Sequence, residues 1–392
     1  MPSMTARERV LAALNHRLPD VVPFDLAGTK VTSLNVVAEQ RLEVCLGMSA
    51  PVVWGNYRAQ RVRMPEAVAH FFDVDVRNVG EPYPSPMPPE LTGPVQVDNW
   101  GVEWSRSPTG TYVPSRCPLA DADHPDDLRQ FPWPDPASWQ PAELMAQQAR
   151  RLHQETDCAI CIDLPDAVVQ YGQYLRGLEQ WLIDMAADKK FAALLMGYIA
   201  DIYVEMVAHV MGAVGDHADL VMIPEDLGGQ QGLLIHPDSY REIIKPLHAR
   251  IFEAVKARSP AKIVLHSCGS VASILGDLVD IGVDGLNPVQ VSAAHMNTAR
   301  LKRDFGDKLC FWGAIDTQRV LPFGTPDDVR AEVRRRIEDL APGGGYVIGP
   351  VHIIQAEVPP ENILAMAEAA HRYGGRSDGS RFRTKIPSEV PA

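Results

Sequence analysis

One short segment of the chain, residues 262–269, has the residue types of a metal or catalytic site. An apolar run ends there in His266, Ser267 and Cys268. Residues i and i+2 of a strand point to the same side, so His266 and Cys268 can converge on one point at the strand end. Neutral imidazole and thiolate are preferred ligands of zinc. The segment predicts a zinc site; the alternative for an isolated pair is a buried cysteine beside a hydrogen-bonded histidine.

The elements that must position this pair follow a regular pattern from about residue 158 onward. Short apolar runs occupy residues 159–162, 220–223, 263–265, 283–286, 309–312 and 346–348. Helix-length segments lie between and after them, near residues 191–212, 237–258, 271–281, 326–340 and 360–373. Alternating helices and continuously apolar strands are typical of a parallel sheet covered by helices.

Polar or titratable side chains follow every one of these apolar runs. In chain order they are Asp163, Glu225 and Asp226, His266 and Cys268, Asn287 and Gln290, Asp316 and Gln318, and His352 and Gln355. All strand carboxyl ends of a (β/α)8 barrel meet at one face, whereas an open sheet gathers polar groups at a switch point. No glycine-rich nucleotide-binding motif is present. The pattern therefore predicts a (β/α)8 TIM barrel.

The predicted barrel carries additional segments. Thr5 and Glu8 match a capping box that opens a short N-terminal helix, and residues 21–26 have the pattern of a first buried strand. Residues 50–145 are rich in Pro and Trp and predict an insertion of small antiparallel strands and long loops. We expect one domain over residues 1–375 and a flexible tail over residues 376–392.

Composition limits the possible partners and compartments. The net charge of −13 argues against a nucleic acid as the main partner. We find no apolar run that would span a bilayer and no signal-peptide core at the N-terminus, so no membrane association is expected. The six cysteines are sparse and unevenly spaced, as in a reducing compartment. These features predict a cytoplasmic protein.

Several segments resemble the uroporphyrinogen decarboxylase superfamily. They are TARERVLAAL at 5–14, HSCG at 266–269, GAIDTQ at 313–318, GGYVIGP at 344–350 and PPEN at 359–362. The resemblance implies a TIM barrel and either of two branches, the cofactor-free decarboxylases or the zinc-containing, corrinoid-linked methyltransferases, such as the methylcobamide:coenzyme M enzymes. The decarboxylases carry an Arg-rich N-terminal segment that holds substrate carboxylates, and this chain has DLAGT at 25–29 instead. The resemblance therefore favours the methyltransferase branch.

The resemblance also implies a set of metal ligands. It carries the zinc motif onto His266 and Cys268, and it brings His352 near the place of a cysteine in the coenzyme M enzymes. Cys310 is the alternative third ligand, and a carboxylate such as Glu225 or Asp226 is a candidate to complete the set. A His2Cys set leaves a position open, as catalytic zinc sites do. The missing cysteine puts coenzyme M itself in doubt as the acceptor.

The function that follows is zinc-dependent transfer of a methyl group between a corrinoid (methylcobamide) and a small acceptor. The acceptor would be a thiol or tetrahydrofolate, and the reaction could serve O- or N-demethylation. The expected catalytic residues are Asp226, Asp316 and Asp163, and the expected cofactor-contacting residues are Asn287, Gln318 and Gln355. The chain lacks the D-x-H-x-x-G signature of cobalamin domains, so a separate carrier protein would bring the corrinoid. We expect a monomer or homodimer.

Two other interpretations remain open. One is a metal-free decarboxylase or lyase with His266 and Asp226 as acid and base. The other is a binding barrel without catalytic activity. Tyr171, Tyr174 and Trp181 at helical spacing are predicted to belong to the core rather than to a ligand platform. Metal content distinguishes the first function from the other two.

Overall fold

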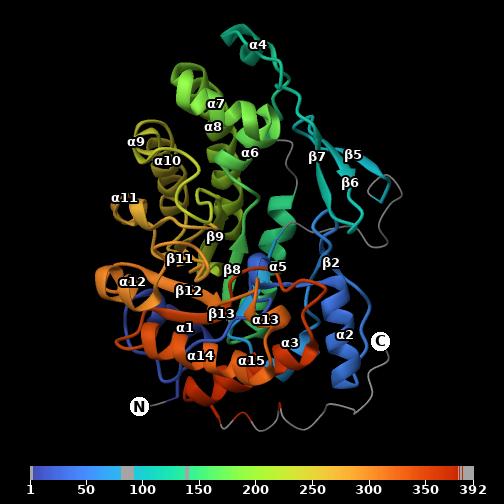
Figure 1. Cartoon of the computed structure of the whole chain (residues 1–392), viewed down its shortest axis with the longest axis vertical. Coiled ribbons are helices and arrows are strands. Elements are labelled where there is room, and N and C mark those ends of the chain that lie inside the picture. The colour runs from blue at the N-terminus through green and yellow to red at the C-terminus, as the bar shows by residue number, and fades with distance from the viewer. Residues whose placement is uncertain (1–2, 81–91, 137–140, 378, 380–381, 383–392) are drawn as a thin grey trace.

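The computed structural model describes residues 3–80, 92–136, 141–377, 379 and 382, and its centre is a curled parallel sheet (Figure 1). In the described part of the chain this sheet has seven strands in the order β13-β12-β11-β10-β9-β8-β4. The strands are β4 (Val76–Val79), β8 (Ala159–Asp163), β9 (Leu220–Pro224), β10 (Lys262–His266), β11 (Gly285–Asn287), β12 (Cys310–Ile315) and β13 (Tyr346–Pro350). Six of them contain the six predicted apolar runs or overlap them.

The eighth position of the predicted barrel holds no strand in the described residues. Phe24 makes an isolated parallel bridge to Ile348 of β13, and its carbonyl accepts from the amide of Asp75 next to β4. The strand predicted over residues 21–26 is therefore wrong, although this segment does lie between the two edges of the sheet. Pro23 has no N–H to donate, and Ala27 has a positive φ of 59°, so a regular ladder cannot extend here. The observed sheet is a half-barrel of the expected α/β class.

Helices cover the outer surface of the sheet (Figure 1). Along the chain they are α5 (Pro141–Glu155), α6 (Val168–Arg176), α7 (Leu178–Ala187), α8 (Lys189–Val214), α9 (Pro237–Ser239), α10 (Lys245–Lys256), α11 (Leu275–Asp280), α12 (Thr298–Phe305), α13 (Val320–Phe323), α14 (Pro326–Leu340) and α15 (Pro360–Tyr373). Proline occupies the first turn of α14 and of α15, where its missing N–H is not needed. Both helices have the predicted bounds.

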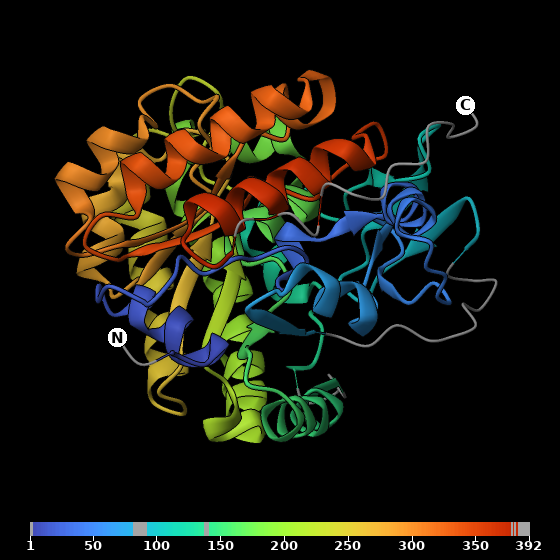
Figure 2. The same cartoon turned by 90° about the horizontal axis from the view of Figure 1, so that it is seen from below.

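The N-terminal helix α1 (Ala6–Leu14) begins at the predicted capping box of Thr5 and Glu8. It closes the end of the sheet opposite to the strand carboxyl ends, where Val10 and Leu14 pack with Leu220 and Cys310 at strand starts. Figure 2 shows the molecule from this side. The predicted site must therefore open at the other end of the sheet.

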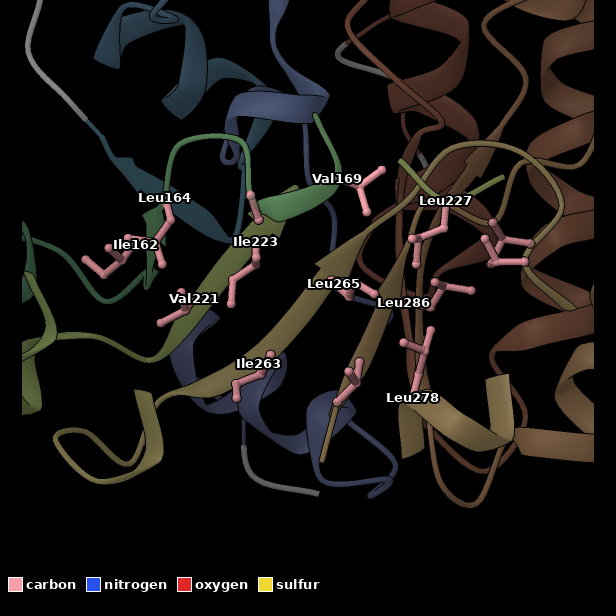
Figure 3. Packing of buried hydrophobic residues seen from close by; sticks show 14 of the residues in the cluster. Ile162, Leu164, Val169, Val221, Ile223, Leu227, Ile263, Leu265, Leu278 and Leu286 are labelled. Atoms are coloured by element: carbon pink, nitrogen blue, oxygen red, sulfur yellow. The ribbon is translucent and has the colours of Figure 1, made fainter. Parts of the chain in front are cut away.

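Both faces of the sheet are apolar, as a buried parallel sheet requires. Ile162, Val221, Ile223, Ile263 and Leu265 point toward the helices and belong to the main core (Figure 3). The alternate positions point into the curled interior and form a second cluster, whose strand members are Val76, Ala159, Cys161, Leu220, Met222, Val264, Cys310, Trp312 and Val347. This packing on both faces holds the strands in their curved arrangement.

The predicted insertion at 50–145 is only partly separate from the barrel. It contains the expected antiparallel sheet of β5 (Val95–Val97), β6 (Glu103–Arg106) and β7 (Tyr112–Arg116), and α4 (Pro125–Gln130). Its earlier part forms β2 (Trp54–Asn56), β3 (Arg61–Val62) and α3 (Glu66–Phe72). Strand β3 pairs on one side with β2 and on the other with β1 (Leu34–Asn35), which directly precedes α2 (Val36–Leu46). Strand β4 then joins the barrel sheet next to β8, which the sequence analysis missed. The prolines between 82 and 89 lie outside the described residues.

Two further expectations differ from the structure. The segment Lys189–His217, which contains α8, is long and apolar enough to cross a membrane by length and composition, with a mean hydropathy of 1.6. This corrects the statement that no such stretch exists, although half of that window is buried and α8 packs against α5, α6, α7 and α10. Most of the predicted tail, 376–392, lies outside the described residues, but Phe382 is buried and stacks on Phe72.

Helix α2 buries two carboxylates one turn apart. Glu39 is 3% and Glu43 is 6% exposed, and the Oε1 atom of each has no hydrogen-bond partner within the described residues. Burial, and secondarily the neighbouring Glu43 carboxylate, raise the pKa of Glu39 to about 7. The folded state therefore binds a proton at Glu39 that the unfolded chain releases near pH 4.5.

This pair predicts a stability difference that depends on pH. Because the pKa of Glu39 is raised on folding, its contribution to stability is complete below about pH 4.5 and is lost as pH rises through about 7. We expect Glu39→Gln to exceed the wild type in free energy of unfolding by up to about 3 kcal/mol at pH 8, and the difference to close toward pH 5. Urea unfolding at the two pH values measures this, with the exposed Glu253→Gln as control. A difference independent of pH would contradict the account.

Candidate metal centre and adjoining cavity

Three potential metal ligands converge at the carboxyl ends of the strands. His266 ends β10, Cys268 lies two residues further, and His352 lies two residues beyond the end of β13. Their ligand atoms all lie within 4.8 Å of one another. The Cys268 Sγ is 3.6 Å from His266 Nε2, and the two imidazole rings have centroids 5.4 Å apart. The structure thus brings together the three residues that the sequence analysis predicted as ligands.

The ring of His266 is oriented by a residue of the neighbouring strand. His266 is in register with Asn287 of β11, and its Nδ1 lies 2.6 Å from the Asn287 Oδ1. An amide oxygen only accepts, so Nδ1 carries the proton and Nε2 presents its lone pair toward Cys268. Such a partner on the distal nitrogen is typical of histidines that bind metals. Asn287, predicted to contact a cofactor, therefore contacts the candidate ligand.

The loop that carries Cys268 is fixed by backbone contacts. The backbone amide of Cys268 donates to Asp226 Oδ1 at 2.8 Å, and that of Gly269 donates to Gln290 Oε1 at 2.6 Å. Gly269 has a φ of +82°, and a Cβ there would lie 2.4 Å from the carbonyl carbon of Gly228. Only glycine allows this approach of two loops. The thiol position is thus set by contacts between the loops after β9 and β10.

Burial controls the protonation of the three candidate ligands. Burial lowers the pKa of His266, and burial together with the neighbouring His266 lowers the pKa of His352 to about 4. Burial, followed by the Asp226 carboxylate, raises the pKa of the Cys268 thiol above its usual range. Two neutral imidazoles are ready to bind a cation, and a divalent ion would have to displace the thiol proton. This donor set fits zinc, with a position left open for a further ligand.

Two of the other candidate ligands, Glu225 and Cys310, are separated from this cluster. Glu225 is fully buried and accepts from the Val169 amide at 2.9 Å and pairs with His248 at 2.8 Å, so it is engaged beneath the site. Cys310 is in the core at the start of β12, the end remote from His352. Asp226 is the nearer carboxylate, with its Oδ1 3.9 Å from His266 Nε2. The alternatives Glu225 and Cys310 therefore receive no support.

The remaining predicted residues fall into two groups. Asp163 and Gln355 line the same cavity as His352. Burial raises the pKa of Asp163 to about 6, and its Oδ2 accepts from the Lys30 amide at 2.7 Å. By contrast, Asp316 accepts from the amide of Gln318 at 2.7 Å and so closes its own turn. The Gln318 Oε1 accepts from Ser292 Oγ at 3.0 Å. Neither Asp316 nor Gln318 is among the described residues that line the cavity.

A cavity of about 680 Å³ adjoins the cluster at His352. Its walls include four cationic side chains, Lys30, Arg58, Arg61 and Arg63, and six aromatic ones, Trp100, Trp104, Tyr112, Tyr171, Tyr174 and Tyr203. The sequence analysis assigned Tyr171 and Tyr174 to the core, but both are partly exposed to this cavity; only Trp181 is fully buried. The Arg-x-Arg at 61–63, together with Trp100 and Trp104 of the insertion, was the available signal for this wall.

The uroporphyrinogen decarboxylase (URO-D) family profile matches residues 126–373. The chain belongs to this family. It is 29% identical over 167 residues to the methylcobamide:CoM methyltransferase MtaA of Methanosarcina barkeri, a match that covers 43% of this chain and 45% of that protein. It is 24% identical over 187 residues to the uroporphyrinogen decarboxylase of Chlorobaculum tepidum, covering 47% and 50%. The chain thus spans about half the length of the curated relatives it matches.

The fold also has a solved counterpart. A methyltransferase structure from Methanosarcina mazei superposes with a TM-score of 0.63 and 19% identity over 95% of this chain and 99% of that one. This likeness concerns the fold, and it extends to the N-terminal part that the URO-D profile leaves unmatched. The resemblance to the URO-D family that the sequence motifs indicated is confirmed.

The contact between His266 and Asn287 predicts an effect on metal affinity. Asn287→Leu removes the acceptor for Nδ1, and we expect zinc affinity to fall about 10–100-fold. Asn287→Asp keeps an oxygen at that place and should stay close to the wild type. Competition against a chromophoric chelator measures both affinities. Equal affinity of the Leu variant and the wild type would show that this hydrogen bond does not position a ligand.

Proposed function

We propose that this chain is a zinc-dependent methyltransferase that moves a methyl group between a corrinoid and a small acceptor. The observation that carries the proposal is the convergence of His266, Cys268 and His352 within 4.8 Å. Two imidazoles and one thiol form a preferred donor set for zinc, and three protein ligands leave a position open for a reactant. The similarity to a methylcobamide:CoM methyltransferase supports the corrinoid as one of the two reactants.

Zinc held there would supply the charge that keeps a coordinated thiol ionised or polarises another acceptor. The surrounding residues prepare that place. Asn287 holds His266 with Nε2 facing the site, and Asp226 holds the backbone of Cys268. Asp163 faces the cavity with a pKa of about 6 and is proposed to hold or release a proton there. We assign Asp316 to the support of its turn instead.

The partners follow from the same proposal. We propose that a separate carrier protein presents the corrinoid, because the chain has no cobalamin-domain signature. The acceptor is a thiol or tetrahydrofolate, and O- or N-demethylation is the wider reaction it would serve. A cytoplasmic location and a monomeric or homodimeric state remain predictions from the sequence.

A metal-free decarboxylase is the second candidate, because uroporphyrinogen decarboxylases are also among the relatives. The segment at 25–29 argues against the usual porphyrinogen substrate, whose several carboxylates need cationic partners. Asp25 is fully buried and accepts hydrogen bonds from Trp312, Thr32 and Gly28, so it stabilises the interior of the barrel and faces no substrate. The segment at 25–29 therefore contains a buried carboxylate and no arginine that could bind the carboxylates of a porphyrinogen.

Metal analysis combined with a methyl-transfer assay tests the proposal. We expect about one zinc per chain in the wild type and thiol- or folate-dependent demethylation of methylcobalamin by it. Cys268→Ala should lose both the zinc and this activity. Cys117→Ala removes a partly exposed thiol elsewhere and should keep both. The proposal fails if the wild type takes up no zinc when it is supplied, or if Cys268→Ala retains zinc and activity.

A further inference from the structure

We infer that the substrate other than the corrinoid is an aromatic carboxylate. Its carboxylate would bind Arg58, its ring would lie against the aromatic wall of the cavity, and its other end would reach His352. The name substrate rests on the proposed methyl transfer, whereas the binding itself can be measured without it. Arg58 and His352 both line the cavity of about 680 Å³. Its volume is in the range of sites for drug-sized ligands and exceeds what a small thiol would fill.

Four of the aromatic rings form a continuous wall. Trp100 stacks on Tyr171 with ring centroids 4.3 Å apart, and Trp104 meets Tyr174 edge-on at 5.0 Å. Tyr171 and Tyr174 are themselves 6.0 Å apart, so the two pairs join. All four line the cavity, with the tryptophans on the insertion and the tyrosines on α6. A planar ring binds well to such a surface by stacked or edge-to-face contact.

Arg58 provides hydrogen-bond donors beside this wall. Its guanidinium carbon lies 4.9 Å from the centroid of the Trp104 ring, and its Nη1 is 3.5 Å from Asp98 Oδ2. Its side chain is 31% exposed and donates no hydrogen bond to any of the described residues. Asp98 already accepts from the amides of Trp100 and Val102 and from the Trp104 indole. The guanidinium is therefore held in place by charge and by the ring, with its paired N–H groups available to a carboxylate.

Two other acidic residues of the cavity, Asp166 and Asp163, have polar partners of their own. Asp166 lies 3.5 Å from the Lys30 ammonium and accepts from the Tyr174 hydroxyl, so its charge is compensated on the α6 side. Asp163 faces the cavity together with His352. Arg58 lies in the turn between β2 and β3, and the Tyr112 amide donates to its carbonyl. We therefore expect the anion at Arg58 and the reactive end of the ligand at His352, which lines the same cavity.

Arg58 and the two tryptophans of the wall belong to a part of the chain outside the matched URO-D profile. Arg58, Asp98, Trp100 and Trp104 all precede residue 126, where the match begins. The metal-ligand candidates and both tyrosines lie inside it. The family match therefore does not indicate which ligand binds at this wall. The ligand is inferred from the wall's own side chains.

Calorimetric titration of zinc-supplied protein with matched probes tests the inference. We expect 4-methoxybenzoate to bind at least ~10-fold more tightly than 4-methoxytoluene, which lacks the charge, or cyclohexanecarboxylate, which lacks the ring. Arg58→Ala should weaken 4-methoxybenzoate about 10–100-fold and leave 4-methoxytoluene unchanged, and Arg58→Lys should recover part of the loss. Arg106→Ala, which removes an exposed arginine of β6 on the strand that carries Trp104, should have no effect.

A parallel titration with 5-methyltetrahydrofolate separates two sources of the aromatic carboxylate. Arg58-dependent binding of the folate supports a pterin substrate, and Arg58-dependent binding of the benzoate alone supports an aryl methyl ether. The inference is overturned if neither carboxylate binds, if the neutral probe binds as tightly, or if Arg58→Ala weakens all probes alike. If the protein took up no zinc or transferred no methyl group but still bound the carboxylate through Arg58, the proposed function would be overturned and this ligand assignment would stand.

Discussion

The curvature of the parallel sheet is the constraint on which the site depends. His266 ends β10 and His352 follows β13, and these strands are three positions apart in the sheet. In a flat sheet the spacing of strands would separate them by about 14 Å, whereas their ligand atoms lie within 4.8 Å of each other and of Cys268. Apolar side chains on both faces hold the curve, and the bridge at Phe24 joins its open edges.

Burial then gives the converged groups their chemical character. It keeps both imidazoles neutral and the thiol protonated, so the three donors neither repel one another nor attract stray anions. The same burial strengthens the attraction between a bound cation and the thiolate, which favours release of the thiol proton. The adjoining cavity is different in character, since charged and aromatic side chains from the N-terminal third form much of its wall. The barrel thus supplies the candidate metal ligands, and the segments before it supply much of the cavity wall.

The sequence predicted those features that depend on local pattern. Continuous apolar runs, capping residues and the prolines of α14 and α15 predicted six strands and five helical segments from residue 159 onward, but not α6, α7, α12 or α13. The H-x-C spacing predicted a convergent pair. The ligand His352 came from a family resemblance, because its approach depends on a curved sheet that spacing alone does not specify.

What the sequence missed depends on contacts between distant segments. The pairing of β4 with β8 and the failure of residues 21–26 to form a strand are decided by which edges remain open once the sheet has curled. Tyr171 and Tyr174 have the spacing of core residues, and only the packing of the insertion against α6 turns them toward a cavity. The role of Asn287 likewise required the register of β10 and β11.

X-ray absorption at the zinc edge, on protein loaded with one equivalent of zinc, tests the central claim most directly. The account predicts one sulfur ligand at about 2.3 Å and two imidazole nitrogens at about 2.0–2.1 Å, with the remaining position taken by a light atom. A shell of nitrogen and oxygen without sulfur, or one with two sulfurs, would contradict a site made of His266, Cys268 and His352.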